Sequence, residues 1–198
     1  MGRSSSARTR LVACAGRRIH ASSYAAASVE DLCVDAGVQK GSFYHFFPSK
    51  HDLALAAIDD HWARAVTTIL EPAFAPDIEP LERITRFFHT IATRQRARVV
   101  LGCPFGNLAA ELGSQDKVIR ARIRQVFDGY QMYFERALRD AEATGSLRGV
   151  DVPSAARALV AYFQGALLLA KTSNDASVID ALGDQALNLV TGTRLEST

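Results

Sequence analysis

Hydrophobic positions recur at spacings of three and four residues through almost the whole chain, while alternation with a period of two is nearly absent. After residue 50, Pro and Gly separate these helical patterns from one another. The helices predicted there span about 49–70, 80–98, 104–113, 115–144, 152–173 and 176–191. With three more near the N-terminus, the pattern predicts an all-α chain of about nine helices.

Residues 28–50 predict two short helices and the start of a third. Ser28, with an acidic residue three positions later, is typical of a helix N-terminus. Gly37 then supplies a tight turn, because glycine adopts positive φ without strain. Pro48 ends the second helix, and Ser49 begins the next one. Helix, glycine turn and helix form the helix-turn-helix pattern, whose second helix enters the DNA major groove.

Residues 40–47 read KGSFYHFF and are followed at once by Pro48, Ser49 and Lys50. This string resembles the DNA-binding domain of the TetR/AcrR family of bacterial transcriptional regulators, and the similarity covers about residues 8–62. The resemblance implies a three-helix, helix-turn-helix DNA-binding domain at 1–50. A helix at about 49–70 would link it to a C-terminal effector-binding and dimerisation domain at 51–198.

Four positions depart from the family pattern, and one of them is Ser23, which precedes Tyr24 where the family usually has Gly. Gln39 stands where the family usually has Ser or Thr, so the second helix loses its capping hydroxyl. Arg18 replaces a Leu that usually packs in the first helix. Gly16 lies inside that helix, where glycine costs about 1 kcal/mol relative to alanine. Because of these differences, the operator preference of a relative does not transfer to this chain.

The residues expected at the DNA divide into those that position the protein and those that read bases. The resemblance places Lys50 at a phosphate, with an ordinary surface lysine as the alternative. Gln39 and Lys40 have the donors that adenine and guanine edges accept. The full expected set is Ser28, Gln39, Lys40, Gly41, Ser42, Tyr44, His45 and Lys50.

The aromatic residues of this segment have two interpretations. Tyr44 and His45 are expected to reach phosphate or sugar through their polar ends, and the alternative is a half-buried aromatic pair. Phe43, Phe46 and Phe47 are expected in the core rather than at the DNA.

Charge is distributed unevenly, although the formal net charge is only +2. Residues 1–50 contain seven Lys or Arg and three acidic residues, whereas the remainder is slightly acidic. A solvated charged surface would explain such an excess alone. Together with the helix-turn-helix pattern it indicates double-stranded DNA as the partner, because basic faces attract backbone phosphates.

Composition argues against several other classes of protein. Three cysteines are an odd number without metal-like spacing, so neither a disulfide framework nor a metal or other cofactor is expected. The N-terminal residues lack a signal-peptide core. The most apolar run, 158–170, is shorter than the roughly 20 residues that cross a membrane. These features predict a cytoplasmic protein without membrane attachment.

Of the last two predicted helices, 152–173 is apolar on more than one side, and 176–191 carries an apolar stripe. A helix with two apolar sides must bury both, one of them most simply against a second copy of the chain. A homodimer would read a palindromic operator with both second helices. The alternative is the core of a monomer. The residues expected at the dimer interface are Leu159, Phe163, Leu167, Val178, Leu182 and Leu189.

Aromatic residues with a few polar neighbours predict a pocket for a small, mostly apolar effector in the C-terminal domain. The alternative is plain core. The candidates are Trp62, Phe88, His89, Cys103, Phe105, Asn107, Glu111, Phe127, Tyr130, Phe134, Phe163 and Gln164.

We expect that an effector controls the protein by releasing it from DNA. Three other possibilities remain open. Cys103 precedes Pro104 and would cap a helix, where the dipole activates a thiol toward electrophiles; a buried, inert cysteine is the alternative. A partner protein could replace the effector. A small enzyme using Cys103 and His89 lacks every familiar catalytic motif, so the chain is expected not to be an enzyme. Repression is the family's usual mode.

Overall fold

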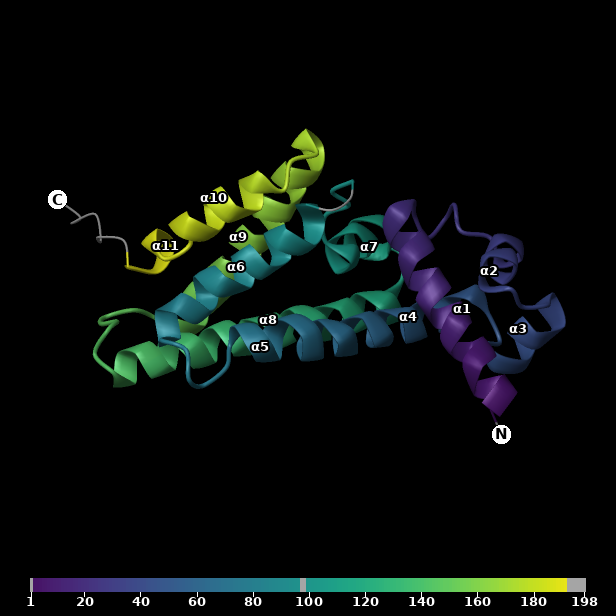
Figure 1. The fold of residues 1–198 in the computed structure, drawn as a ribbon, viewed down its shortest axis with the longest axis horizontal. Coiled ribbons are helices and arrows are strands. Elements are labelled where there is room, and N and C mark those ends of the chain that lie inside the picture. Colours follow the sequence, from purple (N-terminus) through teal and green to yellow (C-terminus); the bar gives the residue numbers. More distant parts are fainter. Residues whose placement is uncertain (1, 97–98, 192–198) are drawn as a thin grey trace. The chain divides into compact units, whose positions relative to one another are not determined.

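The computed structural model describes residues 2–96 and 99–191, and within these ranges every regular element is a helix (Figure 1). The prediction of an all-α chain is therefore confirmed. Two groups of helices are nearly continuous: α4, η1 and α5 follow one another directly, and α10 and α11 are separated by a two-residue turn. Counted in this way, the described residues form nine helical segments, as predicted.

The chain divides into two compact units. The first consists of residues 1–65 and 103–126, and the second of residues 66–102 and 127–198. The first unit thus adds a distant segment to the N-terminal helices. Its elements are α1 (Gly2–Ala21), α2 (Val29–Ala36), α3 (Lys40–Phe46), α4 (Lys50–Ala65), α7 (Pro104–Leu112) and the first turns of α8 (Lys117–Ala143).

The second unit contains the remainder of α8 and six further elements. The functional division into 1–50 and 51–198 stays a prediction, and residues 97–98 and 192–198, which it included, lie outside the described residues. The other elements of this unit are η1 (Val66–Leu70), α5 (Glu71–Ala73), α6 (Pro80–Arg96), α9 (Val152–Ser173), α10 (Ser177–Gln185) and α11 (Asn188–Thr191).

Helix ends follow the expected local chemistry. Gly145 adopts φ +77° directly after the end of α8, as predicted, and Gly102 adopts φ +75° just before α7. Asn174 ends α9 in the left-handed conformation, which Asn tolerates better than most residues. Pro104 begins α7, where its missing N–H leaves no hydrogen bond unmade.

The sequence predicted that the helix beginning near Ser49 ends before Pro72. The structure differs, because the helical path continues past this proline. It widens into a π-turn over Val66–Leu70, and Pro72 then lies in the first positions of α5. A proline costs little at a helix start, because the first N–H groups have no partner within a helix. The local π geometry thus lets the helical path continue to Ala73.

Aromatic rings fill the core of the second unit. Phe87 and Phe163 have ring centroids 4.8 Å apart, and Phe134 meets Phe87 edge-on at 5.4 Å. At its edge the buried guanidinium of Arg83 donates to Asp140 at 2.5 Å and to the Ile78 carbonyl at 2.9 Å. These bonds satisfy a charge that would be costly to bury alone.

One helix among the described residues, α9, is long and apolar enough to cross a membrane by length and composition, with a mean hydropathy of 1.3. It is longer than the run 158–170 on which the sequence argument rested. Core helices of soluble proteins pass the same test. Seven α9 residues, from Val152 to Ala170, are buried in the second unit, and 33% of the apolar 18-residue window is buried.

Candidate nucleic-acid interface

Local chemistry builds the helix-turn-helix as the sequence predicted. The hydroxyl of Ser28 accepts the Asp31 N–H at 3.0 Å and caps α2. Gly37 ends the helix with φ +60°, and the following Val38 N–H donates to the Cys33 carbonyl at 2.9 Å. This left-handed turn directs the chain from α2 into α3. Gln39 precedes α3 and makes no side-chain capping bond, as its long amide led us to expect.

A small core holds α3 against α1, α2 and α4. Phe43 and Phe47 are buried, together with Leu11, Leu32 and Leu53. Phe46 is partly buried against the same cluster. The prediction that these phenylalanines belong to the core is therefore confirmed for Phe43 and Phe47. They fix the opposite, polar side of α3 toward solvent.

Two arginines of α1 bind residues of α2 and stabilise the helix-turn-helix. Arg18 binds Asp35 at 2.5 Å and Asp31 at 3.3 Å, and its hydrogen bond with Asp35 raises the pKa of the guanidinium. Arg10 donates to the Ala36 carbonyl at 2.9 Å, beside the turn. Arg18 thus replaces the apolar contact of the usual Leu with ion pairs to α2. Sequence reasoning missed these bonds, because both acids lie more than a dozen residues away.

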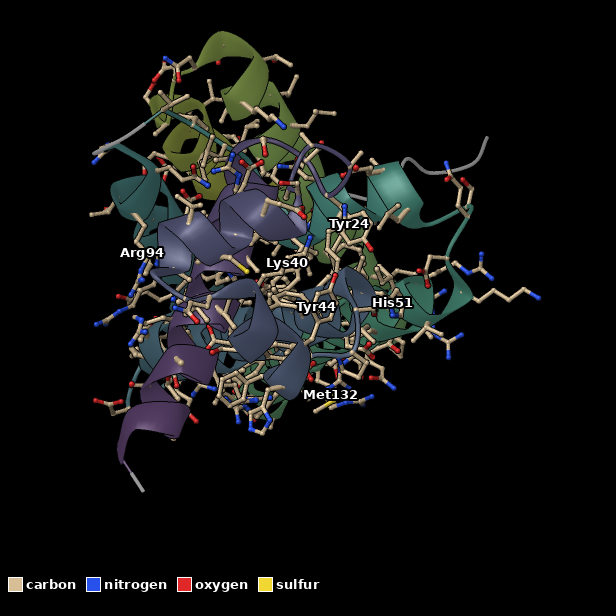
Figure 2. All side chains as sticks on the ribbon, turned by 90° about the vertical axis from the view of Figure 1, so that its right-hand side faces the viewer. Tyr24, Lys40, Tyr44, His51, Arg94 and Met132 are labelled. Atoms are coloured by element: carbon tan, nitrogen blue, oxygen red, sulfur yellow. The ribbon has the colours of Figure 1, made fainter. Side chains whose placement is uncertain are left out.

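The side of α3 turned away from the core exposes Lys40 and Tyr44, two of the residues expected at DNA (Figure 2). Ser28, Ser42 and Lys50 are only partly exposed, at its edge. No side chain of this set is buried, and all of these residues belong to the first unit. The exposed members are Gln39, Lys40, Gly41, Tyr44 and His45.

Lys40 forms an ion pair with Glu30 of α2. The hydrogen bond between them raises the pKa of Lys40 and lowers the pKa of Glu30. Both side chains are largely exposed, and exposed pairs contribute little to stability. Lys40 can therefore exchange this partner for a base edge or a phosphate at small cost.

Lys50 is held at the start of α4 by a single residue. Its ammonium donates to the Tyr24 carbonyl at 3.0 Å and lies 4.2 Å from the centre of the Tyr24 ring. Burial raises the pKa of the Tyr24 hydroxyl. Tyr24 thus holds one cation at the start of α4.

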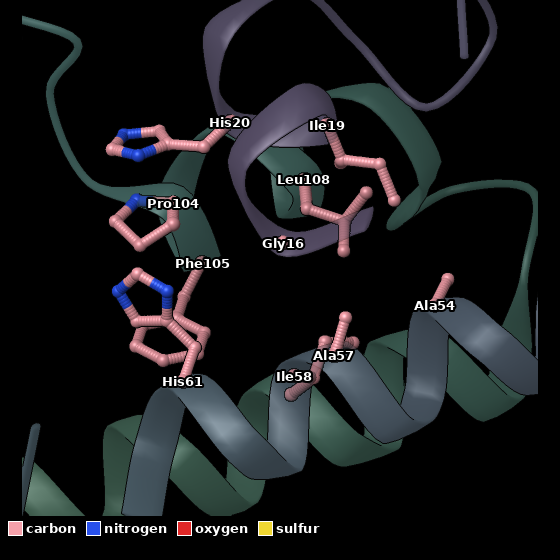
Figure 3. A pocket seen from close by; sticks show the side chains of 10 residues that line it. All are labelled: Gly16, Ile19, His20, Ala54, Ala57, Ile58, His61, Pro104, Phe105 and Leu108. Atoms are coloured by element: carbon pink, nitrogen blue, oxygen red, sulfur yellow. The ribbon is translucent and has the colours of Figure 1, made fainter. Parts of the chain in front are cut away.

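A pocket of about 30 Å³ lies behind this surface, between α1, α4 and α7 (Figure 3). His20 and His61 line the same side of it, with ring centroids 6.2 Å apart, and Phe105 meets His61 edge-on at 5.3 Å. Burial, together with smaller contributions from His20 and Arg64, lowers the pKa of His61 from 6.5 to about 4. His61 is therefore neutral at pH 7. The pocket has room for one or two waters.

The residues predicted for an effector pocket are divided between the two units. One group belongs to the first unit: Trp62, Cys103, Phe105, Asn107 and Glu111. The other belongs to the second unit: Phe88, His89, Phe127, Tyr130, Phe134, Phe163 and Gln164.

Within the second unit, ring packing brings Phe88, Tyr130 and Phe134 around Phe87 and Phe163. His89 lies outside this cluster, half exposed, where its ring nitrogens contact Asp180 at 2.8 Å and Asp184 at 3.1 Å. Gln164 has a buried side-chain Nε2 without a hydrogen-bond partner. An oxygen atom of a bound ligand would supply the hydrogen-bond acceptor that this donor lacks.

Three residues predicted at the dimer interface lie elsewhere. Leu159, Phe163 and Leu167 are at most 3% exposed, because they face the core of their own unit. The surface side of α9 instead exposes Leu168 and Leu169, each by more than half. Of the other three, Leu189 is exposed and Val178 and Leu182 are partly exposed. The two-sided apolar pattern was real, but it could not tell which side faces inward.

The chain matches two family models. Residues 15–57 match "Bacterial regulatory proteins, tetR family", and residues 80–185 match "Tetracyclin repressor-like, C-terminal domain". The two matched regions include the helix-turn-helix and most of the second unit.

This chain is also similar to known transcriptional regulators over most of their length. An uncharacterised helix-turn-helix transcriptional regulator of Lactococcus lactis subsp. lactis is 31% identical over 82% of this chain and 82% of its own. The transcriptional repressor DhaR of Mycobacterium sp. (strain GP1) is 29% identical over 88% of this chain and 85% of its own. The crystal structure of a TetR transcriptional regulator from Chloroflexus aurantiacus, 27% identical, superposes with a TM-score of 0.86 over 98% of both chains.

Proposed function

Because this chain belongs to the TetR family of bacterial transcriptional regulators, we propose that the exposed face of α3 reads one half of a palindromic operator. The chain is a DNA-binding transcriptional regulator, and repression is the mode we propose for it, in keeping with a relative named as a repressor. The proposed reading domain is 1–50, linked by the helix at 49–70 to an effector-binding and dimerisation domain at 51–198. We expect it to act in the cytoplasm, where the operator lies.

The observation that carries this proposal is that α3 has one buried side and one exposed side. Phe43 anchors the helix in the core, and Lys40 and Tyr44 project from the other side into solvent. In helix-turn-helix proteins the second helix presents its exposed side to base edges. We assign base reading to Gln39, Lys40 and Ser42, with Gly41 allowing close approach.

Phosphate contacts are assigned to the rim of this face. The start of α2 at Ser28 presents backbone N–H groups, which attract anions at a helix N-terminus. Tyr44 and His45 offer polar ring ends, and Lys50 offers a cation already fixed by Tyr24. Such contacts position the protein without reading sequence.

A homodimer is proposed because one α3 reads only a few base pairs. Leu168 and Leu169 of α9 and Leu189 of α11 are the exposed apolar side chains of the C-terminal helices that a second copy would cover. Val178 and Leu182 are partly exposed and belong to α10, which lies between α9 and α11 in the sequence. Two-fold symmetry would then place two half-sites about 34–36 Å apart, or a multiple of that distance.

A small, mostly apolar effector is proposed to bind in the second unit. Its aromatic cluster is tightly packed, so binding would have to open it, and the unpartnered Gln164 amide suits a ligand carrying a hydrogen-bond acceptor. The proposed mechanism is release from DNA when binding changes the separation of the two reading domains.

Control by thiol modification remains a second possibility, supported by the position of Cys103. The thiol caps α7 and accepts the Gly106 N–H at 3.3 Å, as the sequence predicted for a helix N-terminus. A partner protein acting in place of an effector is the remaining form of control. The enzyme alternative is not proposed, because the matching family models and the relatives are those of transcriptional regulators.

Base reading can be tested with duplexes that the unsubstituted protein selects from a random pool. We expect Lys40→Ala to weaken binding by about 1–3 kcal/mol per lost base contact and to relax the preference at one position of each half-site. Arg86→Ala, which removes an exposed cation from α6, is the matched control and should bind like the parent. Equal binding and equal preference in both variants would contradict the assignment to Lys40.

A further inference from the structure

Glu111 of α7 grips the loop that connects α1 with α2. One carboxylate oxygen accepts the Tyr24 N–H at 2.8 Å, and the other accepts the Ala25 N–H at 2.7 Å. All three residues belong to the first unit. Hydrogen bonds to a charged acceptor are about twice as strong as neutral ones. Glu111 therefore ties α7 to a segment that lies more than eighty residues earlier in the chain.

The other N–H groups of this loop whose bonds are described, those of Ala26 and Ala27, bond locally. The Ser23 hydroxyl accepts the Ala26 N–H at 3.1 Å, and the Tyr24 carbonyl accepts the Ala27 N–H at 3.3 Å. Only Glu111 reaches the loop's amides from a distant element among the bonds described. Without it, two consecutive N–H groups just before Ser28 would need new acceptors, and the path of the loop would be less well defined.

Tyr24 connects the hydrogen bonds of Glu111 with Lys50, the residue expected at a phosphate. Its N–H binds Glu111, while its carbonyl and ring hold the Lys50 ammonium. One residue therefore has Glu111 on one side and Lys50 on the other. A displacement of Glu111 would move the group that fixes Lys50.

The segment after α7 makes a second tie to the same place. Asp116 caps α8 by accepting the Val118 and Ile119 N–H groups at 2.9 Å, and it binds His51 at 3.0 Å. His51 follows Lys50 in the first turn of α4. The hydrogen bond from Ile119 is the main cause that lowers the pKa of Asp116, with His51 adding to it. Both ends of the α7–α8 connection thus contact the surroundings of Lys50.

We propose that Glu111 is a positioning residue for DNA binding, which couples the place of α7 to the phosphate contact made by Lys50. It touches no DNA itself. A shift of α7 that breaks its two hydrogen bonds would release Tyr24, loosen Lys50 and weaken the grip on the phosphate backbone. This inference rests on the proposed DNA-binding face, and it assigns to Glu111 a role different from the effector contact that the sequence suggested.

The test compares Glu111→Gln and Glu111→Ala with the unsubstituted protein, on duplexes which that protein has selected from a random pool. The amide of Gln keeps one acceptor but turns a donor toward the second N–H. We expect about tenfold weaker binding for each variant. The control is Glu142→Gln, which removes an exposed carboxylate near the end of α8 and should change nothing.

Salt dependence separates positioning from general loss of structure. Each phosphate contact contributes about 0.9 to the slope of log K against log salt concentration. If Lys50 loses its contact in both subunits, the slope should fall by about 2. In a double-mutant cycle, Glu111→Gln should add little to Lys50→Ala, because both remove the same contact.

Wild-type-like affinity and slope in Glu111→Gln, or full additivity with Lys50→Ala, would overturn the inference. The proposed function would still stand in that case, because it fails only if the unsubstituted protein itself binds no duplex. Amide exchange in the unsubstituted protein gives a second measurement that needs no variant. The Tyr24 and Ala25 N–H groups should exchange slowly in the DNA complex, and fast exchange there would also overturn the inference.

Discussion

Gly183 of α10 lies directly against Phe88 of α6: a β-carbon at Gly183 would stand 2.5 Å from the Phe88 Cβ. Real carbon atoms do not approach so closely, so one of the two helices would have to move. Phe88 is fully buried. The absence of a side chain at Gly183 is thus what permits α10 to pack this closely on α6.

Gly183→Ala is therefore expected to destabilise the protein by about 1–3 kcal/mol, although alanine is the better helix former. Denaturant unfolding followed by circular dichroism measures the change. Unaltered or raised stability would show that α10 does not pack on Phe88 as described.

Gly16→Ala makes the opposite change in α1 and serves as a matched control. A β-carbon there meets nothing within 4 Å, because Gly16 lines the pocket between α1, α4 and α7. We expect a gain in stability of up to about 1 kcal/mol, since glycine inside a helix costs about that much. A loss of stability in the same unfolding experiment would contradict the open space beside Gly16.

His61 should make stability depend on pH. Its pKa is about 4 in the folded protein and 6.5 without the fold, so only the unfolded chain binds this proton between those values. Its neighbours His20 and Arg64 oppose a positive charge, and Asp60 favours one. The contribution is complete above pH 6.5 and is lost as pH falls toward 4. It should amount to about 2 kcal/mol between pH 7 and pH 5.

The measurement is the free energy of unfolding of the parent and of His61→Gln across this range. The variant lacks the titrating group, so its stability should fall less steeply with acid. Parallel curves for the two proteins would mean that His61 is not buried in its neutral form.

Cys103→Ser tests control through the thiol. Serine also caps helices, so α7 should form normally. Because Cys103 is only 5% exposed, we expect N-ethylmaleimide to affect DNA binding of the parent and of the variant alike. If the reagent releases the parent from DNA and spares the variant, Cys103 is a sensor and the inert interpretation is wrong.

The helix-turn-helix could be predicted because its signals are local. Ser28 and Gly37 fix the ends of α2 within a few residues of sequence, and Pro48 ends α3 in the same way. The all-α fold followed from the spacing of apolar residues alone. The π-turn before Pro72 did not, because local rules predict that a proline ends a helix rather than that the helix widens to admit it.

Contacts over long sequence distances were beyond such rules. Glu111 was assigned to an effector because its type suits a polar ligand, yet it binds backbone N–H groups far earlier in the chain. Arg18 looked like a fault in α1, whereas it forms ion pairs with α2. On α9, periodicity showed two apolar sides but gave no means of telling the core side at Leu167 from the surface side at Leu168.

Selection of duplexes from a random-sequence pool tests most directly whether this chain reads a palindromic operator as a dimer. The enriched sequences should contain two inverted half-sites, about one helical turn or a multiple apart, and should bind two chains per duplex. Affinity should fall steeply with salt, as phosphate contacts require. An unenriched pool and no retained DNA even at low salt would contradict the account.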